Sequence, residues 1–280
     1  MLAIKVVRNH HFSPLRYPGG KTSLTSFFDD IIKKYNLHDG TYVEPYAGGA
    51  GAALSLLLLE KVHKIIINDL DHAIYSFWKA SIYDTSNFVK KIQSVEISIN
   101  EWRKQKAIYK DKQSSEFDLG FATFFLNRTN RSGIIEGGPI GGMEQVGKWK
   151  IDARFNKTDL ITRIERISYY RDRIKIYEKD GVKLLKYLKK TKQMFIYLDP
   201  PYYKKGSSLY LNHYIDSDHV RLAKFLNSNL NLNWLLTYDS ANFIKDLYSE
   251  KRIKEFSLNY SAYQKMKGSE IMIFSDALLN

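Results

Sequence analysis

Asp199-Pro200-Pro201-Tyr202 is the stretch of this sequence whose residue types point most directly to chemistry. It follows the apolar run 194–198, which indicates a buried parallel strand that stops abruptly. Open α/β sheets bind ligands just beyond the carboxyl ends of their strands. The two prolines remove two N–H donors, so a carboxylate, the Pro200 carbonyl and a flat ring remain. That set suits a planar base with an exocyclic amino group, although a Pro-rich turn capped by Asp199 would look the same.

A glycine-rich turn and an acidic residue indicate a nucleotide site nearer the N-terminus. Gly48-Gly49-Ala50-Gly51 would let the backbone approach a ligand at a helix N-terminus. Asp69 ends the next apolar run, where an acid accepts the hydroxyls of a ribose in both NAD and S-adenosylmethionine sites. The pattern G-x-G-x-x-G is incomplete, because Leu54 stands at its third glycine. Asp69 could instead cap the helix expected from about residue 71.

Strands and helices that would position these residues alternate at both ends of the chain. We expect strands at 41–46, 64–69, 174–177, 194–199, 233–238, 253–258 and 270–274, and helices at 24–32, 52–60, 71–83, 181–188, 216–226 and 241–248. Between about 84 and 170 the alternation gives way to a mostly helical pattern. We therefore predict one α/β, Rossmann-like domain formed by 1–83 and 171–280, interrupted by an inserted domain at 84–170.

Composition limits the classes of function. The formal net charge of +13, with 20 Tyr and 15 Phe, favours a polyanionic partner over a neutral one, unless it reflects only a lysine-rich proteome. Cysteine is absent, which excludes disulfides, thiolate zinc sites and a Cys nucleophile. The N-terminus lacks the apolar core of a signal peptide, and the longest apolar run, 52–59, is too short to cross a bilayer. We expect a cytoplasmic protein without a membrane partner.

Taken together, four motifs carry a resemblance that none of them carries alone. They are Tyr17-Pro18-Gly19-Gly20-Lys21, the run from Glu44 to Gly51, Asn68-Asp69 and Asp199-Pro200-Pro201-Tyr202. In this order they resemble the Dam-type adenine methyltransferases, the D12-class, alpha-group DNA (adenine-N6) enzymes. The resemblance spans roughly 12–83 and 171–280. It implies an S-adenosylmethionine-dependent methyltransferase sheet that modifies adenine N6 in double-stranded DNA, with target recognition in the insertion.

The resemblance also implies roles for individual residues. S-adenosylmethionine would be held by Tyr17, Lys21, Glu44, Gly48, Asp69, Asp180 and Asp199. The family usually has Trp where Tyr17 stands, and the match at Asp180 is loose because Glu178 lies two residues earlier. Asp199, Pro200 and Tyr202 would be catalytic: two acceptors bind the amino group, the freed lone pair attacks the sulfonium methyl in line, and the ring stacks on a flipped base. No metal is required.

The insertion and the segment after the catalytic motif supply candidate DNA contacts. Arg128, Asn130 and Arg131 carry side chains that pair with guanine and adenine in the major groove, but a self-capped polar loop would have a similar composition. Lys204 and Lys205 begin a cationic stretch that we expect to order over the flipped nucleotide. A further set could contact phosphates or form only a solvated helix face: Arg154, Lys157, Arg163 and Arg166.

Several alternatives stay open at the level of sequence. The same chemistry could act on RNA adenine, cytosine N4 or a protein amide, although the basic charge favours nucleic acid. An NAD oxidoreductase is disfavoured by the incomplete glycine pattern. A non-catalytic DNA-binding relative is disfavoured by the intact cofactor motifs. We expect a monomer, and the sequence leaves open both the recognition site and a cognate restriction endonuclease.

Overall fold

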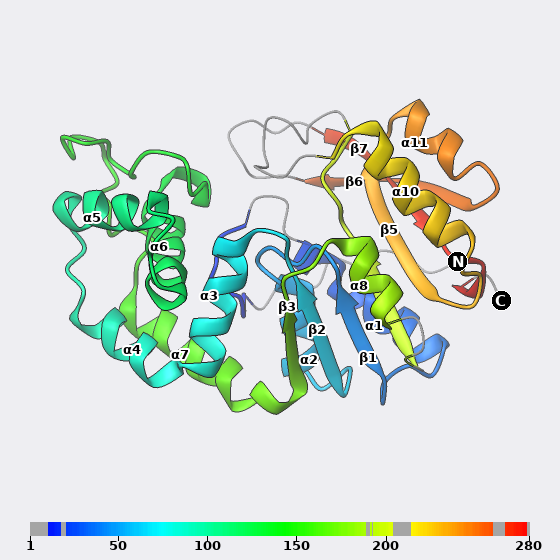
Figure 1. The fold of residues 1–280 in the computed structure, drawn as a ribbon, viewed down its shortest axis with the longest axis horizontal. Coiled ribbons are helices and arrows are strands. Elements are labelled where there is room, and N and C mark those ends of the chain that lie inside the picture. The colour runs from blue at the N-terminus through cyan, green and yellow to red at the C-terminus, as the bar shows by residue number, and fades with distance from the viewer. Residues whose placement is uncertain are drawn as a thin grey trace.

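The computed structural model describes residues 11–17, 21–188, 191, 193–203, 214–259 and 267–278. A seven-stranded sheet in the order β3-β2-β1-β4-β5-β7-β6 runs through this described part of the chain (Figure 1). Its strands are β1 (Thr41–Glu44), β2 (Lys64–Asn68), β3 (Ile174–Tyr177), β4 (Met194–Leu198), β5 (Asn233–Asp239), β6 (Arg252–Asn259) and β7 (Lys267–Phe274). This α/β sheet confirms the predicted fold class.

The order of the strands reverses at β1, between β2 and β4. β1 pairs in parallel with β2 on one side and with β4 on the other, while β5 continues the parallel set beyond β4. The chain thus leaves β1 in one direction and later returns on its opposite side. Ligands of open α/β sheets bind where the order reverses in this way, beyond the carboxyl ends of the strands. β7 runs antiparallel to both of its neighbours, β5 and β6.

Helices cover both faces of the sheet. α1 (Thr25–Lys34) and α2 (Gly51–Leu58) pack on one face, and α8 (Gly181–Leu188), α10 (Asp216–Asn227) and α11 (Asn242–Leu247) pack on the other. Strand side chains alternate accordingly: Ile65 and Ile67 belong to the first core and Ile66 to the second. Both faces are buried, which explains why the strands are nearly continuous apolar runs.

Residues 84–170, all of them described, form helices and short turns beside the β3 edge (Figure 1). The helices here are α4 (Thr85–Ser94), α5 (Ile99–Lys110), α6 (Glu116–Thr129) and α7 (Lys157–Tyr169), with α3 (His72–Tyr83) between them and the sheet. Phe124 of α6 stacks on Phe77 of α3 with ring centroids 5.9 Å apart, and both are fully buried. This aromatic contact holds α6 against α3.

Short 3-10 turns complete the described elements: η1 (Lys21–Leu24), η2 (Arg131–Gly133), η3 (Arg171–Arg173) and η4 (Asp276–Leu278). In the described residues no helix combines the length and the apolar character that a membrane crossing needs.

Candidate active site

Every parallel strand of the sheet ends in or is followed by a carboxylate at the same edge. These residues are Glu44 at the end of β1, Asp69 after β2, Asp180 after β3, Asp199 after β4 and Asp239 at the end of β5. Parallel strands bring their carboxyl ends together, so residues far apart in the sequence meet here. We call this edge the crevice.

Asp199 is held at the centre of the crevice by contacts to both of its carboxylate oxygens. Lys21 Nζ lies 2.7 Å from Oδ2, and the Thr237 hydroxyl donates to Oδ1 at 2.8 Å. Thr237 Oγ1 in turn lies 2.7 Å from the Tyr197 hydroxyl, which is positioned to donate to it. The side chain of Lys21 is 6% exposed and that of Asp199 21%. The carboxylate is therefore oriented from inside the sheet yet remains reachable from solvent.

The residues after Asp199 form one wall of the crevice. Pro200 is buried, and Asp239 accepts a hydrogen bond from the Tyr203 backbone N–H at 2.9 Å, which fixes the turn. Lys21 Nζ lies 5.3 Å from the centroid of the Tyr202 ring. Burial, followed by the Asp199 carboxylate, raises the pKa of Tyr202 well above its usual value. The predicted set of carboxylate, carbonyl and ring therefore lies together, beside the predicted lysine.

The glycine turn adopts a backbone that only small residues tolerate. Gly48 has a φ of +46°, and a Cβ on it would lie 2.6 Å from the Tyr17 ring. Its N–H donates to Asp69 Oδ2 at 2.8 Å, and its carbonyl accepts from Trp78 Nε1 at 2.9 Å. Tyr17, Gly48 and Asp69 are thus in one continuous surface, as the sequence predicted.

Asp69 is fixed by the backbone rather than by a cation. Its second oxygen accepts from the Asp71 N–H at 3.0 Å. Asp71, and not Asp69, is the N-cap of α3, because its side chain accepts from the Ala73 N–H. Desolvation raises the pKa of Asp69 to about 6, so the carboxylate is ionised at neutral pH. Its remaining lone pairs suit two hydroxyl donors.

Glu44 lies below the crevice and stabilises the helix that follows the glycine turn. Its Oε1 accepts from the Tyr42 hydroxyl and from the Ala53 N–H in the first turn of α2, both at 3.0 Å. Burial raises the pKa of Glu44 to about 8, which leaves this side chain mostly protonated at neutral pH. The structure therefore places Glu44 beside the site with an internal bonding role.

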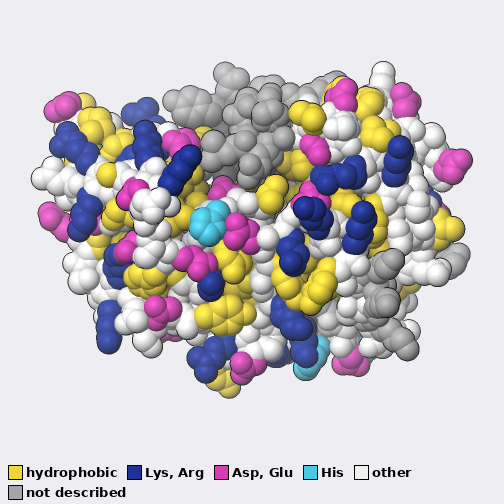
Figure 2. Space-filling model, in the orientation of Figure 1, with side chains coloured by type: hydrophobic (Ala, Val, Ile, Leu, Met, Phe, Trp, Pro, Cys, Tyr) yellow, Lys and Arg dark blue, Asp and Glu magenta, His cyan; other side chains and the backbone are white. Residues whose placement is uncertain are grey.

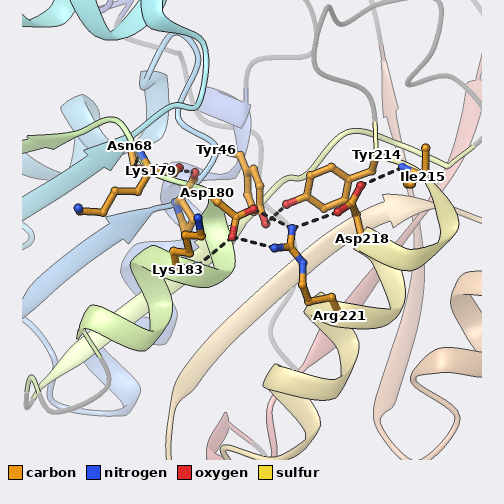
Figure 3. A network of polar contacts seen from close by, with 10 residues as sticks. Tyr46, Asn68, Lys179, Asp180, Lys183, Tyr214, Ile215, Asp218 and Arg221 are labelled. Atoms are coloured by element: carbon orange, nitrogen blue, oxygen red, sulfur yellow. Dashed lines mark hydrogen bonds and ion pairs between the residues drawn. The ribbon is translucent and has the colours of Figure 1, made fainter.

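Asp180 belongs to a polar network at the outer end of the crevice (Figure 3). Its carboxylate accepts from the Lys183 N–H at 3.0 Å and pairs with Arg221 at 2.8 Å. Close by, the Tyr46 and Tyr214 hydroxyls lie 2.7 Å apart. Asp180 thus caps α8 and ties it to α10, while Glu178, the neighbouring acid, contacts His72 at 3.1 Å instead.

The predicted DNA contacts of the insertion separate into buried and accessible side chains. Asn130 is fully buried: its amide nitrogen donates to the Ile134 and Ile135 carbonyls, and its oxygen accepts from Trp102 Nε1. In this structure Asn130 therefore stabilises the loop and has no donor left for a base, as the self-capped alternative anticipated. Arg131 is exposed, and Arg128 is partly buried with Nε donating to the Arg154 carbonyl at 2.7 Å.

Lys204 and Lys205 lie outside the described residues, as do Pro18, Gly19 and Gly20 of the first motif. Among the residues that the structure describes, no three His, Asp or Glu side chains gather in a way that could hold a metal ion.

Sequence reasoning missed the residues that orient the motif residues. Thr237, Tyr197 and Asp239 contact Asp199 or its turn, but each stands in or at the end of an apolar strand run without a motif of its own. The sequence feature that could have indicated them is a hydroxyl and an acid, Thr237 and Asp239, at the carboxyl end of the strand that pairs with β4. Asn127 is a further positioning residue: its side chain accepts from the Arg16 N–H and donates to the Arg16 carbonyl.

Comparison with known proteins places the chain among DNA methyltransferases. The family model described as D12 class N6 adenine-specific DNA methyltransferase matches residues 17–262. The type II methyltransferase M.CviBI of Paramecium bursaria Chlorella virus NC1A is 24% identical over 260 residues, which cover 88% of this chain and 90% of that protein. The modification methylase StsI of Streptococcus sanguinis is 31% identical over 90 residues, 32% of this chain and 12% of that protein.

Proposed function

Because the chain belongs to the D12 class of N6-adenine-specific DNA methyltransferases, we propose that it transfers the methyl group of S-adenosylmethionine to adenine N6 in duplex DNA. One observation carries the detailed proposal: Asp199 is held by Thr237 at the reversal point of the sheet, beside Pro200 and Tyr202. The target base leaves the duplex to reach this crevice, because its amino group is not accessible inside the stack.

The crevice activates the amino group through hydrogen-bond acceptors. The Asp199 carboxylate and the Pro200 carbonyl accept the two N–H bonds, which favours a pyramidal nitrogen with a free lone pair. S-adenosylmethionine supplies a methyl group on a positively charged sulfur. The nitrogen–carbon bond would form as the carbon–sulfur bond breaks, with its electron pair left on the neutral sulfur of S-adenosylhomocysteine, and N6 would then pass one proton to water. Asp199 stabilises the positive charge that develops on N6, and Tyr202 supports the base by stacking.

Lys21 serves two carboxylates in turn in this proposal. In this structure it pairs with Asp199 Oδ2, the position that the target amino group needs. The carboxylate of the methionine moiety offers Lys21 an alternative partner of the same charge. When the cofactor binds, Lys21 would move from Asp199 to the methionine carboxylate and leave Asp199 available to the base. The order of productive binding is therefore the methyl donor first and the target amino group second.

The remaining crevice residues fit the cofactor in two ways. Asp69 and Gly48 present lone pairs and a close backbone to the ribose side, and Tyr17 provides a ring over the glycine turn. Glu44 and Asp180 are engaged with N–H groups of the chain, and Asp180 also with Arg221. We propose that these two acids shape the pocket walls and that Asp180 receives the adenine end of the cofactor only at its margin.

The inserted helices at 84–170 are the proposed target-recognition part, with Arg128 and Arg131 as its accessible candidates. We propose that the protein acts as a monomer and that a cognate restriction endonuclease is its partner.

Transfer of isotopically labelled methyl groups tests the proposal. Unmethylated duplex DNA and structured RNA are each incubated with the protein and labelled S-adenosylmethionine, with Asp199→Ala as the control. We expect label in DNA with the wild-type protein and none with the variant. Label in RNA alone, or equal labelling by both proteins, would contradict the proposal.

A further inference from the structure

Four arginines lie where the N-terminal segment meets the inserted helices. They are Arg16, Arg128, Arg154 and Arg163, and we call them the arginine seam. The net charge does not single them out, because Lys and Arg side chains are scattered over the face seen in Figure 2 with acidic groups between them. The seam is distinguished by how its side chains are held.

Guanidinium groups of the seam join three segments of the chain. Arg16 Nη1 donates to the Asn130 carbonyl at 3.1 Å, and Arg163 Nη1 donates to the Ser13 carbonyl at 3.1 Å. Arg128 Nε donates to the Arg154 carbonyl at 2.7 Å. These contacts tie the segment before the first motif, the end of α6 and the approach to α7 to one another. The guanidiniums of Arg16, Arg128 and Arg163 are therefore held at this junction, and the exposed side chain of Arg154 lies beside them.

Asn127 fixes the backbone of Arg16 from both sides. Its side-chain oxygen accepts from the Arg16 N–H at 2.7 Å, and its amide nitrogen donates to the Arg16 carbonyl at 2.8 Å and to the Gly133 carbonyl at 2.9 Å. Asn127 itself is buried. A ligand of the seam would therefore meet a preorganised Arg16 and would lose little free energy to ordering it.

The seam carries more positive charge than its surroundings compensate. Burial, followed by the charges of Arg16 and Arg163, lowers the pKa of Arg128 to about 10, and the nearby Asp159 carboxylate opposes this shift. Asp159 is already paired with Arg163 at 2.9 Å. Burial and Arg154 also lower the pKa of Arg16. Guanidinium groups brought together in this way are stabilised by an anion that bonds several of them.

We propose that the arginine seam binds a backbone phosphate of the DNA substrate. Guanidinium has five N–H donors in a fork that matches phosphate oxygens, and among the described residues Arg16 and Arg128 each use one of them on a protein acceptor. This proposal rests on the proposed function. It adds that one DNA strand passes next to Tyr17 and the glycine turn, because Arg16 of the seam directly precedes Tyr17.

Two other basic residues of the insertion have different roles. Lys157 Nζ donates to the Gln93 and Val95 carbonyls at 2.8 and 2.6 Å, and Arg166 lies 4.7 Å from the centroid of the Phe12 ring. Of the four residues that the sequence suggested as phosphate contacts, Arg154 and Arg163 therefore remain candidates. The structure adds Arg16 and Arg128 to them.

The salt dependence of DNA binding tests the seam without any need for methylation. The affinity of a fluorescently labelled duplex is measured at increasing KCl in the absence of S-adenosylmethionine, because each phosphate contact contributes about −0.9 to the slope of log K against log salt. For Arg16→Gln/Arg154→Gln we expect a slope shallower by about one and an affinity about tenfold weaker at physiological salt. Arg154→Lys should keep the wild-type slope.

Arg171→Gln is the matched control, because Arg171 is exposed and lies beyond the far end of α7 from Arg154. It removes one positive charge, as Arg154→Gln does alone, and should leave the slope unchanged. Equal slopes for the control and the seam variant would overturn the proposal. If thermal unfolding shows that Arg16→Gln destabilises the fold, the exposed Arg154→Gln alone decides between these outcomes. A wild-type protein that binds DNA through the seam but never methylates it would contradict the proposed function and leave the phosphate site standing.

Discussion

The crevice and the arginine seam are built from opposite charges and by different means. The crevice collects carboxylates because five parallel strands end at one edge, so its positions follow from sheet topology. The seam collects guanidiniums because two loops and two helices meet, and its positions follow from individual bonds such as Arg163 to the Ser13 carbonyl. The difference indicates two separate roles: the crevice provides acceptors for the amino group, and the arginine seam provides donors for phosphate.

This division predicts that crevice substitutions alter methyl transfer and cofactor binding, whereas seam substitutions alter the affinity for DNA and its salt dependence. The largest loss of turnover should come from Asp199→Asn, which replaces one carboxylate oxygen, an acceptor, by an NH₂ group, a donor. Loss of an oriented charge-stabilising group costs about 10³-fold in turnover. Single-turnover methylation at saturating DNA and cofactor measures it, while calorimetry should show that the cofactor still binds. A variant that methylates at the wild-type rate would contradict the role of the crevice in methyl transfer.

Thr237→Val sharpens the same test without touching the substrate contacts. It removes the hydrogen bond to Asp199 Oδ1, and hydrogen bonds to charged groups contribute about 1.5–3 kcal/mol. We expect turnover to fall by at least about tenfold, with KM for DNA unchanged. Thr237→Ser keeps the hydroxyl and should restore most of the rate. If Val and Ser behave alike, the hydroxyl does not orient Asp199.

Asp69 predicts a pH dependence of cofactor binding. Its pKa of about 6 means that the carboxylate is protonated, and loses acceptor capacity, as the pH falls below that value. The Kd for S-adenosylmethionine should rise by up to about tenfold per pH unit below about pH 6. Asp69→Asn should bind weakly without this pH dependence. Calorimetric titrations across the range measure both, and a wild-type Kd that is flat below pH 6 would remove Asp69 from the binding site.

Glu44 predicts the smallest effect, one on stability rather than on turnover. Its pKa of about 8 lies above its value in the unfolded chain, so the native state holds the proton more tightly. The free energy of unfolding should therefore fall as the pH rises from about 4.5 to about 8, and stay low above that. Glu44→Gln should remove this part of the decline. Urea unfolding of both proteins at several pH values measures how the free energy of unfolding depends on pH. The same dependence in both proteins would show that Glu44 is ionised at neutral pH and would contradict the prediction.

Sequence reasoning predicted the crevice far better than the seam. Lys21 and Asp199 stand 178 residues apart, and the family resemblance assigned both to the cofactor site without predicting that they pair. Thr237 was not predictable, because its inward direction depends on the register between Leu236 of β5 and Leu198 of β4. The bonding of Asn130 was equally hidden, because a polar loop that folds back on itself has the composition of one that reads DNA.

The most direct test of the account is mass spectrometry of the nucleosides released from unmethylated duplex DNA after incubation with the protein and S-adenosylmethionine. The account predicts N6-methyladenine as the methylated nucleoside, made by the wild-type protein and reduced by about 10³-fold in Asp199→Asn. Methylation at N4 of cytosine, or on a ring atom of either base, would contradict the assignment of Asp199 and Pro200 as acceptors for the adenine amino group.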